Sequence, residues 1–212
     1  MTLAQLTSLP LGSWLYLGFI ALLGAERVVE LVISSRNAAW ALAHGGVEVG
    51  ERHVVWMKLL HSALFAAIVA EVLLLRPPLS PALAWPLFAV ALMAQGLRYW
   101  AIASLGKHWN VRVIVVPGAQ AVRRGPFRYL RHPNYLAVVL EGLAVPLIHG
   151  AWISALGFSA LNSWLLTVRI RCEERALVTH CDYDRRLGDR RRFIPSGAVE
   201  SKPEREREPP RA

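Results

Sequence analysis

The last long apolar run of the chain ends in charged residues whose types and spacing could do chemistry. Arg169 and Glu173 are four residues apart and Asn162 precedes Arg169 by seven, so on a helix the three side chains share one face. A guanidinium and a carboxylate on one face can bind a zwitterionic molecule that carries both a carboxylate and an amine. The same pair could also form a salt bridge at a helix end, and the spacing does not decide between these interpretations.

A basic loop, GPFRYLRHPNYL, precedes the same apolar region. Pro133 has no N–H to donate and suits the first turn of a helix, so it predicts a helix start at this point. Arg131 and His132 should therefore lie in a fixed entry turn, and Tyr135 should open the helix. We expect this turn to lie at the same water–lipid boundary as the charged end of the later run.

If the two segments converge, their charged groups could bind a zwitterionic cofactor. Arg131 or Arg169 would hold the carboxylate of the cofactor, because a guanidinium can donate two parallel hydrogen bonds to a carboxylate. Glu173 or Glu174 would hold the amine or the ribose hydroxyls. His132 and Tyr135 would complete the site.

The composition indicates that these residues belong to a membrane protein. The chain has 212 residues, of which 54% are hydrophobic, and its mean hydropathy is +0.35. It is too apolar for an ordinary soluble domain and too short for several domains. We expect an all-α polytopic membrane protein with about five transmembrane helices, the last two forming a helical hairpin. The expected spans are residues 14–33, 54–75, 82–104, 135–149 and 151–168.

The Lys and Arg residues of the short loops predict the orientation of these spans. Arg76 is the only basic residue of the second loop, whereas the third loop and the stretch after the last span are rich in Arg. Because basic loops stay in the cytoplasm, the odd-numbered loops and the C-terminus should be cytoplasmic and the N-terminus outside. The span 135–149 is short for a bilayer, so the sequence does not decide whether it crosses fully.

The net charge of +9 favours contact with anionic membrane lipids over nucleic-acid binding. The Arg residues flank the spans and lack an aromatic platform on which bases could stack.

Cys172 and Cys181 fall on the predicted cytoplasmic side, where we expect neither a disulfide nor a metal site. The charged, Pro-rich stretch 196–212 is expected to be disordered, and residues 1–195 to form one integral membrane domain.

Several ionisable residues lie inside the expected spans, where they are costly and become candidates for function. Glu26 and Glu30 share a helix face, and Arg27 can relieve their repulsion. For Glu26 and Arg27, snorkelling or interhelical pairing is the favoured interpretation. For three others, buried pairing and a site role stay equally open: Glu71, Arg98 and Glu141.

With these residues in view, the chain resembles a known family. GPFRYLRHPNYL, the apolar hairpin, RIRCEERAL and RRRFIP are similar to the isoprenylcysteine carboxyl methyltransferase family of integral membrane enzymes. The resemblance covers residues 105–195, which would be the catalytic and cofactor-binding part. It implies methyl transfer from S-adenosylmethionine, a cytosol-facing cofactor pocket and a lipophilic or lipidated acceptor that enters from the bilayer. The RHPxY string alone also resembles phospholipid methyltransferases.

The resemblance also implies roles at matching positions. Arg169 corresponds to the active-site arginine, and Asn162 shares its face as a second catalytic candidate. Glu174 corresponds to the cofactor-binding acid. The spacer between Leu177 and Tyr183 is shorter than in the family and lacks its Gly, which puts the last turn of the cofactor lid in doubt. The remaining cofactor contacts implied are Gln120, Ala121, Val122, Gly125, His132 and Tyr135.

The N-terminal half, ERVVELVISSRNAAWALAHGGVEVGERH, is similar to a bacterial branch linked to O-methylation of long-chain polyketides such as alkylpyrones and alkylresorcinols. That resemblance implies a bacterial inner-membrane O-methyltransferase. Arg169 would orient an anionic acceptor oxygen, while the proton acceptor stays open among His53, His61 and His108. The alternatives are a phospholipid amine N-methyltransferase and a non-enzymatic membrane scaffold.

Overall fold

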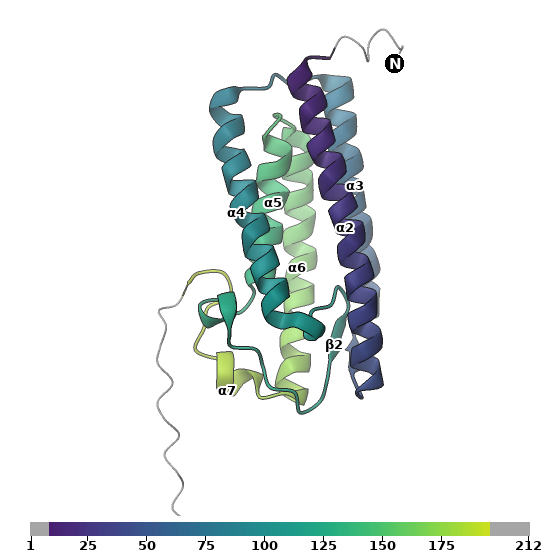
Figure 1. Cartoon of the computed structure of the whole chain (residues 1–212), viewed down its shortest axis with the longest axis vertical. Helices are drawn as coiled ribbons and strands as arrows, with labels where there is room; N and C mark the ends of the chain where they lie inside the picture. The colour runs from purple at the N-terminus through teal and green to yellow at the C-terminus, as the bar shows by residue number, and fades with distance from the viewer. Residues whose placement is uncertain (1–8, 196–212) are drawn as a thin grey trace, which may run out of the picture.

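The computed structural model describes residues 9–195, and within them five long helices run side by side (Figure 1). The stretch 196–212, which the sequence predicts to be disordered, lies outside the described residues. The long helices are α2 (Leu11–Ala43), α3 (Glu51–Leu75), α4 (Pro81–Leu105), α5 (Pro133–Leu147) and α6 (Trp152–His180).

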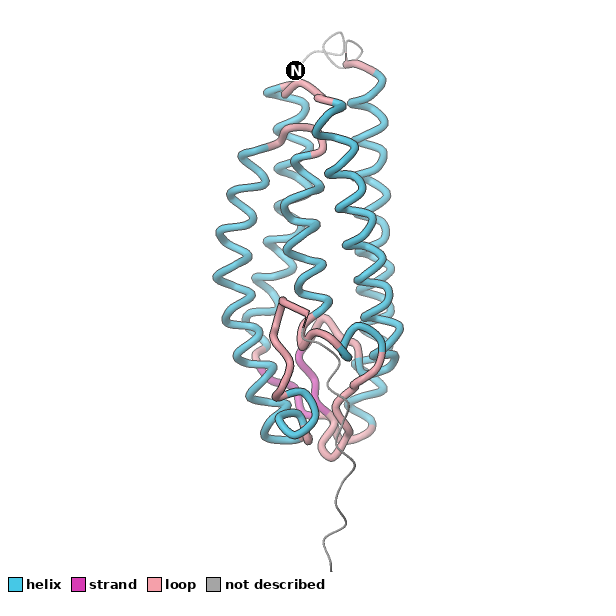
Figure 2. Tube along the Cα trace, turned by 90° about the vertical axis from the view of Figure 1, so that its left-hand side faces the viewer, coloured by secondary structure: helices cyan, strands magenta, loops and turns pink. Residues whose placement is uncertain are grey.

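The connections between the helices fall at two opposite ends of the bundle. The turns from α3 to α4 and from α5 to α6 lie at the end where α2 begins (Figure 1). The other end carries most of the non-helical chain, as Figure 2 shows. The odd-numbered loops and the last described residues therefore share one end, as the loop charges predict. The short elements at this end are β1 (Val47–Val49), η1 (Gly106–His108), β2 (Val113–Val115), η2 (Gly125–Arg128) and α7 (Tyr183–Leu187).

Within residues 9–195, three helices are long and apolar enough to cross a membrane: His53–Leu75, Pro81–His108 and Trp152–His180. The other two long helices depart from that pattern for different reasons. Helix α5 has 15 residues, so it is about 22 Å long against a bilayer core of about 30 Å. Helix α2 has 33 residues but carries Glu26, Arg27 and Glu30 in its middle.

A two-stranded antiparallel sheet departs from the all-α expectation. Strand β1 pairs with β2 through Val47 opposite Val115 and Val49 opposite Val113. The β-branched side chains of both strands favour this extended pairing, and Glu48 pairs with Arg112 across it. The first loop of the chain, which contains β1, therefore holds β2 in place.

Glu71, left open between pairing and a site role, holds the hairpin in place. Its carboxylate accepts hydrogen bonds from the backbone N–H groups of Ile153 (3.0 Å) and Ser154 (2.8 Å), and from the hydroxyl of Ser154 (2.6 Å). These N–H groups belong to the first turn of α6, which has no intrahelical acceptor for them. A side chain of α3 thus caps α6 and fixes its position relative to α3.

Candidate active site

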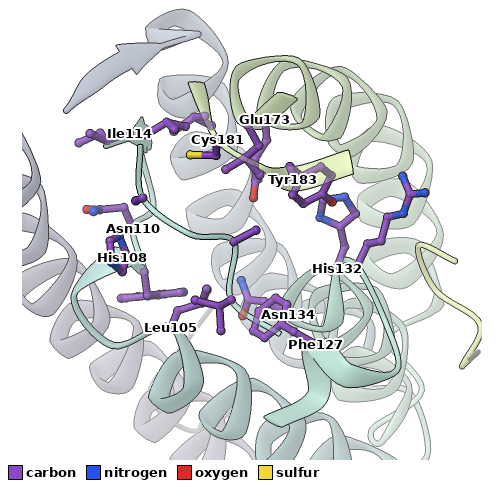
Figure 3. Close-up of a pocket in the computed structure, with 18 of the residues that line it drawn as sticks. Leu105, His108, Asn110, Ile114, Phe127, His132, Asn134, Glu173, Cys181 and Tyr183 are labelled. Carbon is purple, nitrogen blue, oxygen red and sulfur yellow. The ribbon is translucent and has the colours of Figure 1, made fainter. Parts of the chain in front are cut away.

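A cavity opens at the loop-rich end of the bundle, and we call it the loop-end cavity. Its walls come from the end of α4, from η1 and β2, from residues 119–122 and 131–135, and from side chains of α6 and α7. Figure 3 shows Glu173 and Tyr183 on one side of this cavity and Leu105 and Phe127 on the opposite side. Polar and apolar groups thus surround one space.

Three of the predicted cofactor-contact residues, Gln120, Ala121 and Val122, line the loop-end cavity. Their segment is held by the chain that follows α6. The side chain of Asp182 accepts a hydrogen bond from the backbone N–H of Ala121 at 2.9 Å, and Arg186 donates to the carbonyl of Ala121 at 3.0 Å. The segment is therefore fixed against α7.

The start of α5 and the face of α6 meet through the hydroxyl of Tyr135. Arg169 donates a hydrogen bond from its Nε to this hydroxyl at 2.7 Å, and the hydroxyl in turn donates to Glu173. Arg169 is 5% exposed, so its charge is held inside the protein. The predicted convergence of Tyr135, Arg169 and Glu173 is thus present, with the tyrosine joining the two charged groups.

Helix α5 begins at Pro133, as predicted, and His132 precedes it. The ring of His132 is buried and stacks on Tyr135, with 5.2 Å between the ring centroids. His132 Nε2 lies 2.9 Å from Glu174 Oε1. Glu174 does not line the loop-end cavity, so its carboxylate contacts the histidine from behind the cavity wall.

The segment after α7 folds back over the same turn. Arg192 donates two hydrogen bonds to Glu174, at 3.0 and 2.5 Å, and these bonds raise the pKa of Arg192. Arg131 lines the cavity, but its guanidinium donates to the carbonyls of Arg190 (2.6 Å) and Gly188 (2.5 Å). Arg131 thus secures the C-terminal segment, a use that the sequence did not suggest.

Two predicted site residues lie elsewhere. Gly125 has a φ of +58°, and a Cβ there would lie 2.0 Å from the hydroxyl oxygen of Ser104, so this glycine lets the loop pack closely on the end of α4. Asn162 is buried on α6 and its Oδ1 has no hydrogen-bond partner among the described residues. Neither residue lines the loop-end cavity or the second cavity described next.

A second cavity lies between the helices and adjoins the first; we call it the interhelical cavity. It is lined by side chains of all five long helices and by residues 109–111. Both cavities share Trp109, Asn110, Asn134, Tyr135 and Arg169 as lining residues. The Tyr135–Arg169 pair therefore belongs to the wall of both cavities.

The three histidines considered as proton acceptors lie in different places. His108 lines the loop-end cavity and His61 lines the interhelical cavity, whereas His53 lines neither. Nδ1 of His61 lies 2.8 Å from the backbone carbonyl of Met57. Since a carbonyl only accepts, this Nδ1 carries the proton and Nε2 is the basic nitrogen.

Sequence reasoning missed three polar residues of the loop-end cavity. The hydroxyl of Tyr183, Oδ1 of Asn134 and Nδ2 of Asn110 are buried without a hydrogen-bond partner among the described residues, and all three residues line the cavity. Burial also raises the pKa of the Tyr183 hydroxyl, which therefore remains a donor. Of the three, only Asn134 lies within a motif singled out in the sequence, the RHPNY string, and this position could have marked it as a site residue.

Comparison with known proteins gives the family. The chain is 40% identical to Uncharacterized protein YpbQ of Bacillus subtilis over 159 residues, which are 74% of this chain and 94% of that protein. It is 30% identical to an uncharacterized protein of Haemophilus influenzae over 158 residues, which are 72% and 89% of the two chains. A sequence model of the isoprenylcysteine carboxyl methyltransferase (ICMT) family matches residues 87–179.

The chain belongs to the isoprenylcysteine carboxyl methyltransferase family. Membership confirms the resemblance found in the sequence and implies a membrane methyltransferase with a lipophilic acceptor. The matched region begins within α4, before the stretch that carries the motifs, and ends within α6. No solved structure matches the chain.

The stretch from Leu177 to Tyr183, which resembles a shortened form of the family's spacer, builds part of the cavity wall. Leu177, Cys181 and Tyr183 all line the loop-end cavity, and the backbone N–H of Cys181 donates to the carbonyl of Leu177 at 2.9 Å. Among residues 9–195, no three His, Cys, Asp or Glu side chains are grouped so that they could hold a metal ion.

Proposed function

We propose that this protein is an S-adenosylmethionine-dependent O-methyltransferase of the bacterial inner membrane. The acceptor is lipophilic and carries either a carboxylate of the isoprenylcysteine type or a hydroxyl of a long-chain polyketide such as an alkylpyrone or alkylresorcinol. The observation that carries this proposal is the junction of the two cavities at Tyr135 and Arg169. One cavity suits a polar cofactor and the other an apolar acceptor.

The residues of the loop-end cavity fit S-adenosylmethionine. This cofactor carries an amine, a carboxylate, ribose hydroxyls and an adenine ring, so it needs both polar and apolar partners. The partnerless polar groups of Tyr183, Asn134 and Asn110 would satisfy some of its hydrogen-bonding groups, and Leu105 and Phe127 offer apolar surface. When bound, it supplies a methyl group on a sulfonium sulfur that is already electrophilic.

The side chains at the junction have separate tasks in this proposal. Arg169 orients an anionic acceptor oxygen, because its guanidinium is buried and fixed by Tyr135. Glu173 offers a negative charge that favours a cationic cofactor. Glu174 acts through His132, which it holds by a hydrogen bond, so it is a positioning residue for the cofactor. Burial of Tyr135 and Arg169 at the junction would limit the access of water to the transfer.

His61 is the proton acceptor that the geometry favours when the acceptor is a hydroxyl. It lines the interhelical cavity with a basic Nε2, because its Nδ1–H is committed to Met57. A carboxylate acceptor would need no base, so the requirement for His61 depends on the acceptor.

The proposed topology has five spans, with the N-terminus outside and the loop-end cavity in the cytoplasm. Helix α5 is short and α2 is charged, but both run alongside the other long helices in Figure 1, which supports their placement in the membrane. The Arg residues of the loop-rich end support its cytoplasmic side.

Phospholipid amine N-methylation is the second candidate function, because RHPxY also occurs in that class. Cationic side chains at the acceptor junction disfavour an amine there, which leaves the O-methyltransferase as the better supported reaction.

Methyl transfer from radiolabelled S-adenosylmethionine to organic-extractable products tests the proposal. Purified protein should label an alkylresorcinol or an isoprenylcysteine analogue and leave phosphatidylethanolamine unlabelled. Labelling of phosphatidylethanolamine alone would favour the amine reaction. Absence of labelling with all acceptors and with total membrane lipid would favour a scaffold.

A further inference from the structure

A charged cluster joins three helices in the middle of the bundle. It comprises Glu26, Arg27 and Glu30 of α2, Arg98 of α4 and Glu141 of α5. Arg98 donates two hydrogen bonds to Glu141, at 3.1 and 2.5 Å, and Arg27 lies 3.0 Å from Glu30. The sequence left Arg98 and Glu141 open between pairing and a site role, and their pairing is now evident.

The pairing does not use every carboxylate oxygen. Three carboxylates face two guanidiniums in this cluster, so its acceptors outnumber its charge partners. Oε1 of Glu26 and Oε1 of Glu30 are both buried without a hydrogen-bond partner among the described residues. A buried acceptor without a donor is costly, particularly when it belongs to a charged group.

Glu30 and Glu26 differ in what lies beside them. Glu30 lines the interhelical cavity together with Arg27 and Arg98, whereas Glu26 lines neither this cavity nor the loop-end cavity. Glu30 is only 8% exposed, so water does not readily satisfy its free oxygen. The cavity wall therefore contains a buried carboxylate oxygen that lacks a donor, in addition to the amide oxygen of Asn134.

The rest of the interhelical cavity wall is largely apolar. Val28 and Leu31 contribute from α2, Phe65 from α3 and Val138 from α5. These side chains suit an aliphatic chain, and the charged cluster adds a polar part to the wall. A purely hydrocarbon acceptor would leave the free oxygen of Glu30 without a partner.

We infer that Glu30, positioned by Arg27 and Arg98, is a specificity-determining residue that accepts a hydrogen bond from a second hydroxyl of the methyl acceptor. The first oxygen of the acceptor is the one that Arg169 orients and that receives the methyl group. This inference rests on the proposed function, because it concerns the acceptor of that site. The acceptor class is thus an amphiphile with two oxygen functions on one headgroup.

The neighbouring charges favour a neutral hydroxyl over an ammonium group as the donor. Arg27, Lys58 and Arg98 all line the interhelical cavity beside Glu30. Together with Lys58, the two guanidiniums match the three carboxylates of the cluster in charge, so an ammonium group would gain no net attraction there, whereas a hydroxyl can donate to Glu30 without adding charge.

Binding of matched probes to detergent-purified full-length protein tests this inference. The probes are a long-chain alkylresorcinol, the alkylphenol with the same tail, and analogues in which fluorine or an ammonium-bearing group replaces the second hydroxyl. The wild type should bind the alkylresorcinol about tenfold more tightly than the alkylphenol. Glu30→Gln should lose most of this difference, and Glu26→Gln, a matched change that leaves the cavity wall intact, should keep it.

The inference is overturned if the wild type binds the alkylresorcinol and the fluorine analogue equally tightly. This comparison uses the wild type alone and does not depend on whether a variant folds. It is also overturned if folded Glu30→Gln keeps the full preference, or if the ammonium analogue binds most tightly. Titration with S-adenosylmethionine in the same preparation separates the two proposals. Cofactor binding without probe preference contradicts this inference alone, whereas probe preference without cofactor binding contradicts the proposed function alone.

Discussion

Arg169 Nε lies 2.7 Å from the hydroxyl oxygen of Tyr135, at the place where the loop-end cavity and the interhelical cavity meet. The bond joins the first turn of α5 to α6 and holds a buried guanidinium at a fixed position. The same hydroxyl donates to Glu173, so one phenol connects the group proposed to orient the acceptor with the acid proposed to favour the cofactor.

Tyr135→Phe should slow methyl transfer about tenfold or more. The substitution removes one partner from both Arg169 and Glu173, and a hydrogen bond to a charged group contributes about 1.5–3 kcal/mol. The turnover number with saturating acceptor measures the effect. Tyr129→Phe, at a more exposed tyrosine in the loop before α5, is the control and should match the wild type. An unchanged turnover number for Tyr135→Phe would mean that Arg169 needs no positioning.

Arg169→Ala should abolish turnover and leave cofactor binding largely intact, because the guanidinium is assigned to the acceptor oxygen. Calorimetry gives the cofactor affinity and the radiolabel assay gives turnover. Arg171→Ala, an exposed arginine of the same helix, should change neither. Equal losses of binding and turnover in Arg169→Ala would contradict this division of tasks.

Gly125→Ala should destabilise the protein more than Gly118→Ala. Both glycines have positive φ, which costs a residue with a side chain about 1–2 kcal/mol. A Cβ at Gly125 would also meet Ser104, whereas a Cβ at Gly118 would meet nothing within 4 Å. The double change Gly125→Ala with Ser104→Ala should recover part of the extra loss in Tm. Equal Tm values for the two single variants would show that the contact with α4 is unimportant.

Glu71→Ala should lower the stability of the bundle by about 2–4 kcal/mol, because three donors at the start of α6 lose their acceptor. For a chain of this length, we expect Tm to fall by at least about 5 °C. Ser163→Ala, which removes an exposed hydroxyl from the same helix, should leave Tm unchanged. If cofactor binding fell while Tm stayed constant, Glu71 would belong to the site and not to the hairpin.

Much of the candidate site could be predicted from local rules. Pro133 predicts where α5 begins, and the four-residue spacing predicts that Arg169 and Glu173 share a face of α6. These rules depend only on the covalent geometry of proline and on the helical repeat, so they hold without knowledge of the neighbours.

The partners of the charged groups required the fold. Neighbouring residues on a helix point in directions that differ by about 100°, so Glu173 and Glu174 must have different surroundings. The sequence does not say which of the two faces the cavity. Arg131 donates hydrogen bonds to backbone carbonyls of a segment about 60 residues later in the chain. No local sequence pattern predicts such a long-range contact. Gly125 proved to be a packing residue because Ser104 of α4 lies against it.

The paired strands were missed for a similar reason. Each has three residues, which is too short for an alternating pattern to stand out. Their pairing depends on two loops that lie far apart in the sequence, with Glu48 and Arg112 adding a contact between them.

The central claim is that the loop-end cavity binds S-adenosylmethionine, and calorimetric titration of detergent-purified protein tests it most directly. We expect micromolar binding by the wild type, a loss of at least about tenfold in His132→Ala, and wild-type affinity in His44→Ala, whose exposed ring lies away from the cavity. A folded wild type that shows no binding, or a His132→Ala variant with unchanged affinity, would contradict the assignment of this cavity to the cofactor.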